Sequence, residues 1–294
     1  ATTTVYEAAL AARGSEPQGT SEALLPGAND DTREAVSGTI GFTAADGLGS
    51  ISLGGTLINL AGGYPQTVNS TATGTLVVTG VTYNAVTGVG SIAYTYTLLD
   101  NTLVDPSSVS FALIVTDSDP APGADSSSGN LVITIIDDAP IVAADTDSIA
   151  SGVFTAATGN VITGVDVGGG DANATDGSKD NVGADNALVS GVAAGNTNAN
   201  LDSAGTVGAV IVGTYGQLTL QANGNYSYVR NAGSPGGVTD TFTYTVKDGD
   251  GDLAHTTLTI SIGDAGVTTN IPAAGGATTT VYEAALAARG SEPQ

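Results

Sequence analysis

The sequence predicts an all-β protein made of tandem antiparallel β-sandwiches in an extended array. The first observation is a pair of alternating runs, Thr241–Val246 and Leu253–Ile262, whose period of two is typical of strands packed on one face. The second is the composition, with 42 Gly among 294 residues and no Trp, Cys or Met, which favours many short strands and turns over long helices. The third is that this pattern recurs in both halves of the chain.

The first half begins with a strand predicted at Val5–Leu10, although the Ala-rich stretch Glu7–Arg13 is also compatible with a helical turn. Residues 11–37 are polar and contain two prolines, so they predict a loop. Pro140, after Asp137-Asp138-Ala139, ends the last strand because proline cannot continue a ladder, and we place a domain boundary there. The strands between are predicted at Gly38–Thr43, Ser50–Leu53, Thr56–Leu60, Gly74–Thr79, Ser91–Leu98, Ser108–Thr116 and Gly129–Ile136.

The second half, residues 141–265, ends on the same plan as the first, residues 1–140. The segments Gly74–Thr79, Ala93–Thr97, Phe111–Asp119 and Leu131–Asp138 parallel Gly216–Gln221, Asn225–Tyr228, Phe242–Asp252 and Leu258–Asp264. Two diverged copies of one sandwich explain this better than two unrelated folds. In the second half, further strands are predicted at Ile141–Asp147, Ala187–Gly191, Ala209–Thr214 and Gly224–Arg230, and a long Gly/Asp/Asn stretch lies at Asp166–Asn186.

An exact internal repeat joins these halves into a larger unit. Residues 1–18 recur unchanged at 277–294, so residue 277 is equivalent to residue 1 and the period is 276 residues. Eighteen identities in register do not arise by chance, and they predict a tandem array in which each unit contacts its neighbours. Residues 266–294 are then a linker and the first strand of the next repeat, and we expect the chain to begin inside a longer protein.

The charge balance limits the possible partners. There are 29 acidic and 6 basic residues, giving a formal charge of −23. This argues against binding to nucleic acid or to anionic membrane surfaces, since both need clustered Lys and Arg. Without cysteine the chain cannot be stapled by disulfides, and no apolar run approaches the length that spans a bilayer.

Crowded carboxylates point instead to cations. The turn between the two alternating runs places Asp248, Asp250 and Asp252 within five residues, separated by glycines that allow tight folding. Carboxylates this close repel each other unless a cation lies between them, and calcium takes six to eight such oxygen ligands. A first calcium site is predicted from these three residues with Asp264 and Glu283, the strand glutamate of the next repeat.

Two further calcium sites are predicted, with solvated acidic loops as the alternative. The second site combines acidic residues around the domain boundary, Asp117, Asp119, Asp137, Asp138 and either Asp145 or Asp147, with Glu7 as a possible additional ligand. The third lies in the glycine-rich stretch and has the weakest support. Its members are Asp166, Asp171, Asp176, Asp180 and Asp185.

The chain resembles the repeats of giant bacterial adhesins exported by type 1 secretion (RTX-type adhesins). Residues 141–264 resemble a VCBS-type domain through the stretches 158–166, 213–228 and 240–252. Residues 1–140 are similar to the companion type 1 secretion repeat through Val5–Leu10 and Ile133–Pro140, but Asp117-Ser-Asp119-Pro-Ala-Pro replaces the Asp-Gly-Asp-Gly-Asp pattern there. The resemblance implies cadherin-like or immunoglobulin-like sandwiches that form extender rods stiffened by calcium at domain junctions.

These observations lead us to expect a structural role in a secreted, surface-attached adhesin or filament of a bacterial cell, acting in cell adhesion and biofilm. The expected partners are adjacent repeats of the same chain, together with neighbouring fibres or a host or abiotic surface. Two alternatives stay open: a subunit of an extracellular filament joined by strand exchange, and a carbohydrate- or peptide-binding module.

Enzymatic activity is not expected. His255 is the only histidine and lies in a predicted strand, and no nucleophile elbow accompanies it. The residues Tyr94, Tyr96, Tyr226 and Tyr228 alternate along predicted strands, which indicates packing in the sandwiches.

Overall fold

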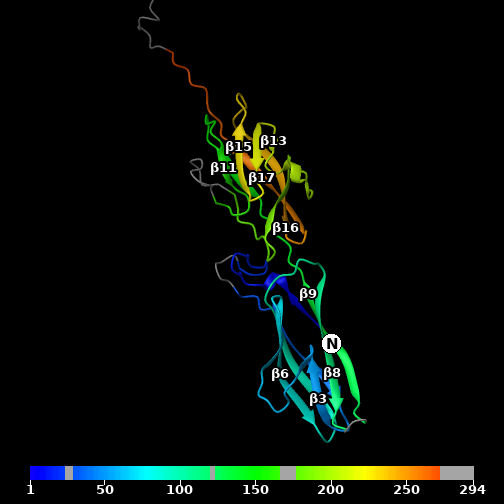
Figure 1. Ribbon diagram of the computed structural model, residues 1–294. Helices are drawn as coiled ribbons and strands as arrows, with labels where there is room; N and C mark the ends of the chain where they lie inside the picture. The colour runs from blue at the N-terminus through cyan, green and yellow to red at the C-terminus, as the bar shows by residue number, and fades with distance from the viewer. Residues whose placement is uncertain (24–28, 120–122, 166–176, 272–294) are drawn as a thin grey trace, which may run out of the picture.

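The computed structural model describes residues 1–23, 29–119, 123–165 and 177–271. The described residues form seventeen strands in four sheets, with two short 3-10 turns at Glu7–Ala9 and Ala204–Thr206. The predicted all-β class is confirmed. Two sandwiches lie end to end along one long axis, as Figure 1 shows.

The first sandwich pairs a five-stranded sheet with a four-stranded sheet. The five-stranded sheet has the order β1-β9-β8-β3-β4, and the other has the order β2-β7-β6-β5. The strands are β1 (Thr2–Tyr6), β2 (Ala35–Thr43), β3 (Leu48–Leu53), β4 (Thr56–Leu57), β5 (Gln66–Ser70), β6 (Gly74–Asn84), β7 (Val89–Leu98), β8 (Ser107–Asp117) and β9 (Ser126–Ile136).

The second sandwich pairs two four-stranded sheets, with the orders β10-β17-β16-β12 and β11-β15-β14-β13. Its strands are β10 (Asp145–Ile149), β11 (Ala157–Asn160), β12 (Ala187–Ala194), β13 (Val210–Val212), β14 (Gly216–Leu220), β15 (Asn225–Arg230), β16 (Val238–Asp248) and β17 (Leu253–Ile262).

Apart from β4, which has no counterpart in the second sandwich, the two sandwiches share one strand order. In each, the first strand joins the edge of a sheet by pairing in parallel with the last strand, β1 with β9 and β10 with β17, while the other pairs are antiparallel. The β6–β7 and β8–β9 hairpins of the first sandwich correspond to the β14–β15 and β16–β17 hairpins of the second. The parallel between the two halves that the sequence shows is therefore a parallel in topology.

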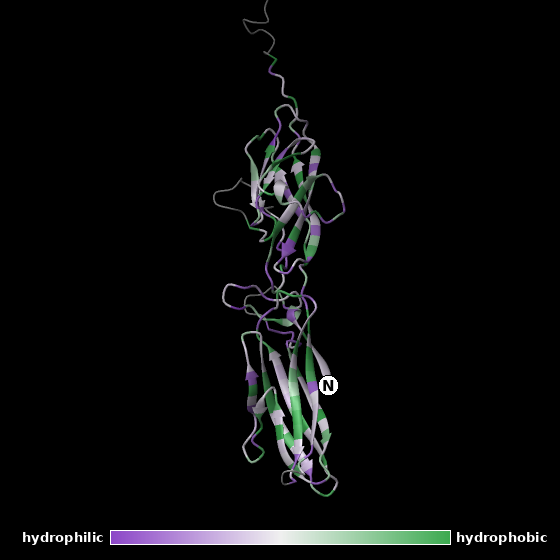
Figure 2. Ribbon diagram, turned by 45° about the vertical axis from the view of Figure 1, so that its right-hand side comes forward, coloured by the Kyte–Doolittle hydropathy of each residue, from purple (hydrophilic) through white to green (hydrophobic). Residues whose placement is uncertain are grey.

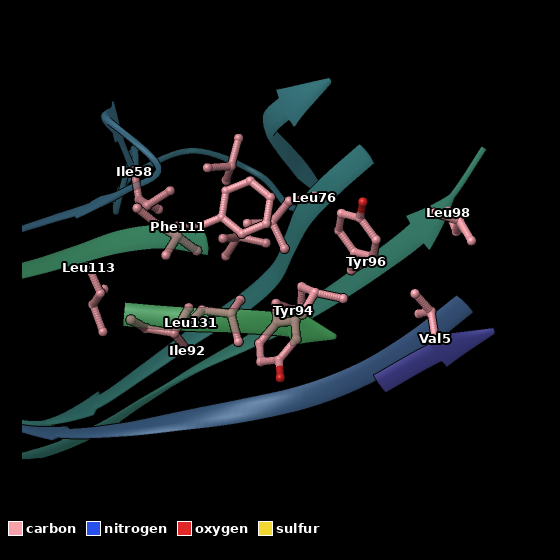
Figure 3. Close-up of a cluster of buried hydrophobic side chains, with 14 of the residues drawn as sticks. Val5, Ile58, Leu76, Ile92, Tyr94, Tyr96, Leu98, Phe111, Leu113 and Leu131 are labelled. Carbon is pink, nitrogen blue, oxygen red and sulfur yellow. The ribbon is translucent and has the colours of Figure 1, made fainter. Parts of the chain in front are cut away.

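Alternating strand residues build the two cores. In β7 every second residue is buried, and Tyr94, Tyr96 and Leu98 face the first core (Figure 3). In the second core, Tyr228 and Phe242 meet edge to face with ring centroids 5.9 Å apart. Hydrophobic and polar bands follow one another along the strands in Figure 2. The prediction that the alternating tyrosines pack inside the sandwiches is confirmed, since Tyr226 is also buried.

Some element bounds differ from the sequence prediction. The stretch predicted as a strand or a helical turn is both, because β1 ends at Tyr6 and the 3-10 turn Glu7–Ala9 follows. The strand predicted at Ile141–Asp147 lies at Asp145–Ile149. Strands β5 and β11 were not predicted, since Gln66–Ser70 and Ala157–Asn160 are short, polar and lack an apolar alternation.

Candidate metal centre at the seam between the sandwiches

Strand register brings acidic residues of both sandwiches to the seam where the two ends meet. Tyr6 is paired with Ile136, so Glu7 and Asp137 leave the parallel strands β1 and β9 side by side. From the other sandwich, Ala187 of β12 pairs with Asp248 at the end of β16, which places Asp185 next to the β16–β17 turn. The acidic turn therefore points back toward the first sandwich.

Five carboxylates meet there, and we call Glu7, Asp137, Asp185, Asp248 and Asp250 the seam cluster. Oxygen atoms of Glu7, Asp137 and Asp185 all lie within 4.8 Å of one another. The charges of Asp248 and Asp250 act on Asp185, and that of Asp250 acts on Asp137. Two members come from the first sandwich and three from the second, so an ion held here would contact both.

Hydrogen bonds hold one oxygen of three of these carboxylates and leave the other oxygen free. Glu7 Oε1 accepts from the amide of Thr102 at 2.7 Å and from its hydroxyl at 2.8 Å, while Oε2 is buried without a partner. Asp248 Oδ1 accepts from the amides of Gly251 and Asp252, at 2.9 and 2.7 Å, and Oδ2 is buried without a partner.

Asp185 follows the same plan across the seam. Its Oδ1 accepts from the side-chain amide of Asn101 in the first sandwich, and its Oδ2 is buried and unpartnered. Asp137 Oδ1 and both oxygens of Asp250 are likewise buried without hydrogen bonds. A carboxylate whose one oxygen is held by hydrogen bonds presents its other oxygen in a fixed direction, which is how a protein orients a metal ligand.

The electrostatics show that this cluster does not tolerate full ionisation on its own. Burial raises the pKa of Glu7 to about 7 and that of Asp137 to about 8, and the charges of Asp250 and Glu7 add to the shift of Asp137. Burial also raises the pKa values of Asp185 and Asp248 to about 6, with neighbouring aspartates contributing. Among the ion pairs of the described residues, none includes a member of the seam cluster.

The residues present fit a hard divalent cation. Glu7, Asp137 and Asp185 bring carboxylate oxygens within 4.8 Å of one another, and calcium binds such oxygens in a flexible geometry that backbone carbonyls and water can complete. The unpartnered oxygens of Asp248 and Asp250 add further negative charge beside them. The cluster contains no Cys or His, so its ligands are carboxylate oxygens alone. Such ligands favour hard cations over softer transition metals. Such an ion would supply the positive charge that the five acidic groups lack.

The predicted grouping of the first site is wrong. Asp248 ends β16 at the hairpin turn, whereas Asp264 follows β17 at the opposite end, beyond the Val238–Ile262 pair. Ten paired residues at about 3.4 Å each separate these two ends, so one ion cannot reach both. Glu283 lies outside the described residues, and Asp252 is exposed beside the turn.

The predicted second site is right in bringing Glu7 and Asp137 together, but its inclusion of Asp117 and Asp119 is wrong for the same reason as above. Asp117 ends β8 next to the start of β9, while Asp137 follows the end of β9, so the antiparallel pair places them at opposite ends of the sandwich. Asp117 and Asp119 instead gather with Asp46, within 4.8 Å of one another, at the far end. That group is half-buried to exposed, which is also common without an ion.

Asp138 joins the sandwiches directly. Its Oδ2 accepts from the amide of Thr20 at 2.8 Å and from the amide of Ala184 at 2.9 Å, and its Oδ1 accepts from the Thr20 hydroxyl. Ala184 belongs to the second sandwich by sequence yet packs in the core of the first. The Asn181 side chain also donates to the Thr20 carbonyl at 3.1 Å. Asp138 therefore connects the two sandwiches through direct hydrogen bonds and is not placed as a metal ligand.

The remaining predicted ligands lie inside the second sandwich. The Tyr244 hydroxyl donates to Asp145 Oδ2 at 2.6 Å and lies 3.4 Å from Asp180 Oδ2. The Tyr226 hydroxyl donates to Asp147 Oδ2 at 2.7 Å. These buried aspartates thus bind tyrosines within one domain and do not reach the seam cluster. Asp166, Asp171 and Asp176 lie outside the described residues.

Sequence reasoning missed the residues that orient the cluster. Asn101 and Thr102 follow β7 in an ordinary polar turn, and no spacing in the sequence connects them to Glu7 or Asp185. The sequence predicts Gly249 only as a turn residue, whereas in the structure a Cβ there would lie 3.0 Å from the Asp185 carbonyl oxygen and 3.2 Å from Leu103 Cδ2. The turn therefore packs closely against both sides of the seam.

His255 lies in β17, as predicted, and its Nδ1 is 2.6 Å from Asn200 Oδ1. Among the described residues, no helix is long and apolar enough to cross a membrane.

Comparison with known proteins gives only distant structural similarity. No family model and no curated protein matches the sequence. The chain is similar to mouse clustered protocadherin gamma C3 EC1-3, with 12% identity, a TM-score of 0.29 and coverage of 90% of this chain and 65% of that one. It is also similar to mouse cadherin-23 EC22-24, with 13% identity, a TM-score of 0.26 and coverage of 73% and 53%. The chain thus spans between half and two thirds of these tandem cadherin-like structures, which are too distant to indicate what it binds.

Proposed function

We propose that this chain is a structural repeat of a secreted, surface-attached adhesin or filament, in which calcium at the seam cluster locks two sandwich domains, 1–140 and 141–265, into a stiff rod. The observation that carries the proposal is the set of buried, unpartnered carboxylate oxygens that both sandwiches contribute. With one ion between them, these oxygens change from mutually repelling groups into shared ligands.

The function that follows is mechanical. Asp138, Asn181 and Ala184 already connect the sandwiches by neutral or charge-assisted hydrogen bonds. Ionised carboxylates on both sides oppose that contact when no cation is bound, so the seam opens or bends more easily. Calcium binding reverses the sign of the interaction and favours the aligned arrangement.

The wider setting rests on the sequence. The 276-residue period supports a tandem array, and the acidic composition supports an extracellular chain that folds and stiffens on meeting calcium. The VCBS-like and type 1 secretion-like stretches favour a giant bacterial adhesin of the RTX type, acting in biofilm or surface attachment. Adjacent repeats are then the main partners, with neighbouring fibres or a host surface as further ones.

The test measures calcium binding and shape on the full chain. Isothermal titration should give at least one calcium site, and small-angle X-ray scattering should show a narrower distribution of shapes with calcium than with EDTA. Asp250→Asn removes one negative charge and replaces one of the two free Asp250 oxygens with an amide NH2, so it should weaken calcium binding strongly. Asp264→Asn, at an exposed position at the opposite end of the sandwich, should leave calcium binding unchanged. Equal calcium affinity in the wild-type chain and Asp250→Asn would contradict the proposal.

A further inference from the structure

An open groove lies between the edges of the two sheets of the first sandwich, beside the start of β1. The groove has a volume of about 250 Å³ and is lined by Phe42 of β2, Leu113 and Val115 of β8, and the segment Ser127–Asn130 of β9, with Ala1 at its head. β1 pairs only with the C-terminal half of β9, because the pairing begins with Thr2 opposite Val132. Residues 126–130 of β9 are exposed along this edge.

The ladder between β1 and β9 is set to continue into this groove. The Ala1 amine donates to the Asn130 carbonyl at 3.0 Å, and the Val132 amide donates to the Ala1 carbonyl at 2.9 Å. Even-numbered residues of β9 therefore present their polar backbone groups toward β1, since successive residues point to opposite sides. The next groups in this row are those of Ser128 and Ser126, which have no β1 residue opposite them.

The repeat identifies a segment that fits. Ala277 is equivalent to Ala1, and residues 272–276, Pro-Ala-Ala-Gly-Gly, immediately precede it. In a tandem array the same five residues would therefore precede Ala1, next to the groove. We propose that this linker segment of each repeat extends β1 of the following repeat, pairing in parallel with Ser126–Asn130 of β9 and filling the groove.

The register agrees with the residue types. Continuing the observed pairing places Gly276 opposite Asn130 and Ala273 opposite Ser127. Gly275 and Ala273 would bond to β9 and face the groove, where small side chains fit between the two sheets. Pro272 falls at a position whose amide points away from β9, so its missing N–H costs no ladder bond.

The described end of the linker supports the same placement. Ile271 is 80% exposed and Val267 is 93% exposed, so the residues that the structure describes leave both apolar side chains uncovered. In the continued register Ile271 shares the inward side with Val5, and it would reach the open end of the sandwich near Phe42 and Val115. Apolar surface on the linker and apolar surface in the groove would then cover each other.

This inference rests on the tandem part of the proposed function but not on calcium. In this arrangement the residues before Ala277 are part of the next domain's sheet, and a continuous strand joins consecutive repeats. A sheet edge that would otherwise offer unpaired backbone groups to other chains is covered by the protein's own sequence.

The test extends the full chain at its N-terminus with a copy of residues 266–276. Amide hydrogen exchange at Ser128 and Asn130 should slow about tenfold or more, because both amides gain an acceptor. Proline at the copies of Ala273 and Gly275 removes the donors that face β9 and should abolish the protection. Proline at the copies of Ala274 and Gly276, whose amides point away, should leave most of it.

Unchanged exchange at Ser128 and Asn130 in the extended chain would overturn the inference, as would an equal response to the two proline pairs. Protection that appears without the extension and grows with protein concentration would assign the groove to a second copy and would also overturn it. Measuring in EDTA and in calcium separates the two proposals, since strand extension is expected in both while seam locking is expected only with calcium.

Discussion

Glu7→Gln is expected to change the stability of the chain in opposite directions with and without calcium. Glu7 is fully buried, and its Oε1 accepts two hydrogen bonds from Thr102 that a glutamine amide oxygen can also accept. The substitution therefore removes the charge while keeping the shape and those contacts. Without calcium, it removes a buried negative charge from a cluster of like charges.

The magnitude follows from the pKa. Burial raises the pKa of Glu7 from 4.5 to about 7. At roughly 1.4 kcal/mol per pKa unit, ionised Glu7 destabilises the metal-free fold by about 3 kcal/mol above that pKa. Glu7→Gln should recover a large part of this in EDTA at about pH 8. In saturating calcium the same change removes a ligand charge and should lower the free energy of unfolding.

Urea unfolding of the full chain, with EDTA and with calcium, measures both effects. Asp264→Asn is the control for charge removal, because Asp264 is exposed and lies at the end of the second sandwich opposite the seam cluster. The control should shift stability by less than about 1 kcal/mol in either condition. If Glu7→Gln destabilises the chain equally in EDTA and in calcium, Glu7 has only a packing role and the reasoning is refuted.

Three further predictions test other parts of the structure. In EDTA, calorimetry should show a lower melting temperature at about pH 8 than at about pH 5.5. The pKa values of Glu7 and Asp137 are raised in the folded chain, which therefore holds protons that the unfolded chain has released, and stability falls as pH rises. A melting temperature that rises with pH over this range would contradict the raised pKa values. Gly249→Ala should weaken calcium binding and lower stability by about 1–3 kcal/mol, since its Cβ would meet the Asp185 carbonyl, whereas Gly63→Ala, with nothing within 4 Å, should not. Tyr244→Phe should lower the free energy of unfolding, measured by chemical denaturation, by about 1–3 kcal/mol. The loss should be larger above about pH 6, the pKa to which burial raises Asp145, because the ionised carboxylate then lacks the hydrogen bond from the hydroxyl. A loss that does not depend on pH would indicate that only packing was changed.

The sequence by itself determined the fold class and much of the strand pattern. Inward residues must alternate in a strand that covers a core on one side, so runs such as Thr241–Val246 and Leu253–Ile262 can be read directly. The acidic residues of the seam were also visible, because Glu7, Asp137, Asp185, Asp248 and Asp250 are all conspicuous carboxylates in a chain of charge −23. Short polar strands such as β5 were not, since they carry no apolar period.

Only the tertiary structure decided which carboxylates meet. Closeness along the chain suggested pairing Asp117 with Asp137 and Asp248 with Asp264, but each pair is separated by the length of an antiparallel strand. Parallel pairing of β1 with β9 instead aligns Glu7 with Asp137, and the register of β12 with β16 brings Asp185 to the turn. Strand direction and register are set by long-range pairing across the whole sandwich, which no local pattern of residues contains.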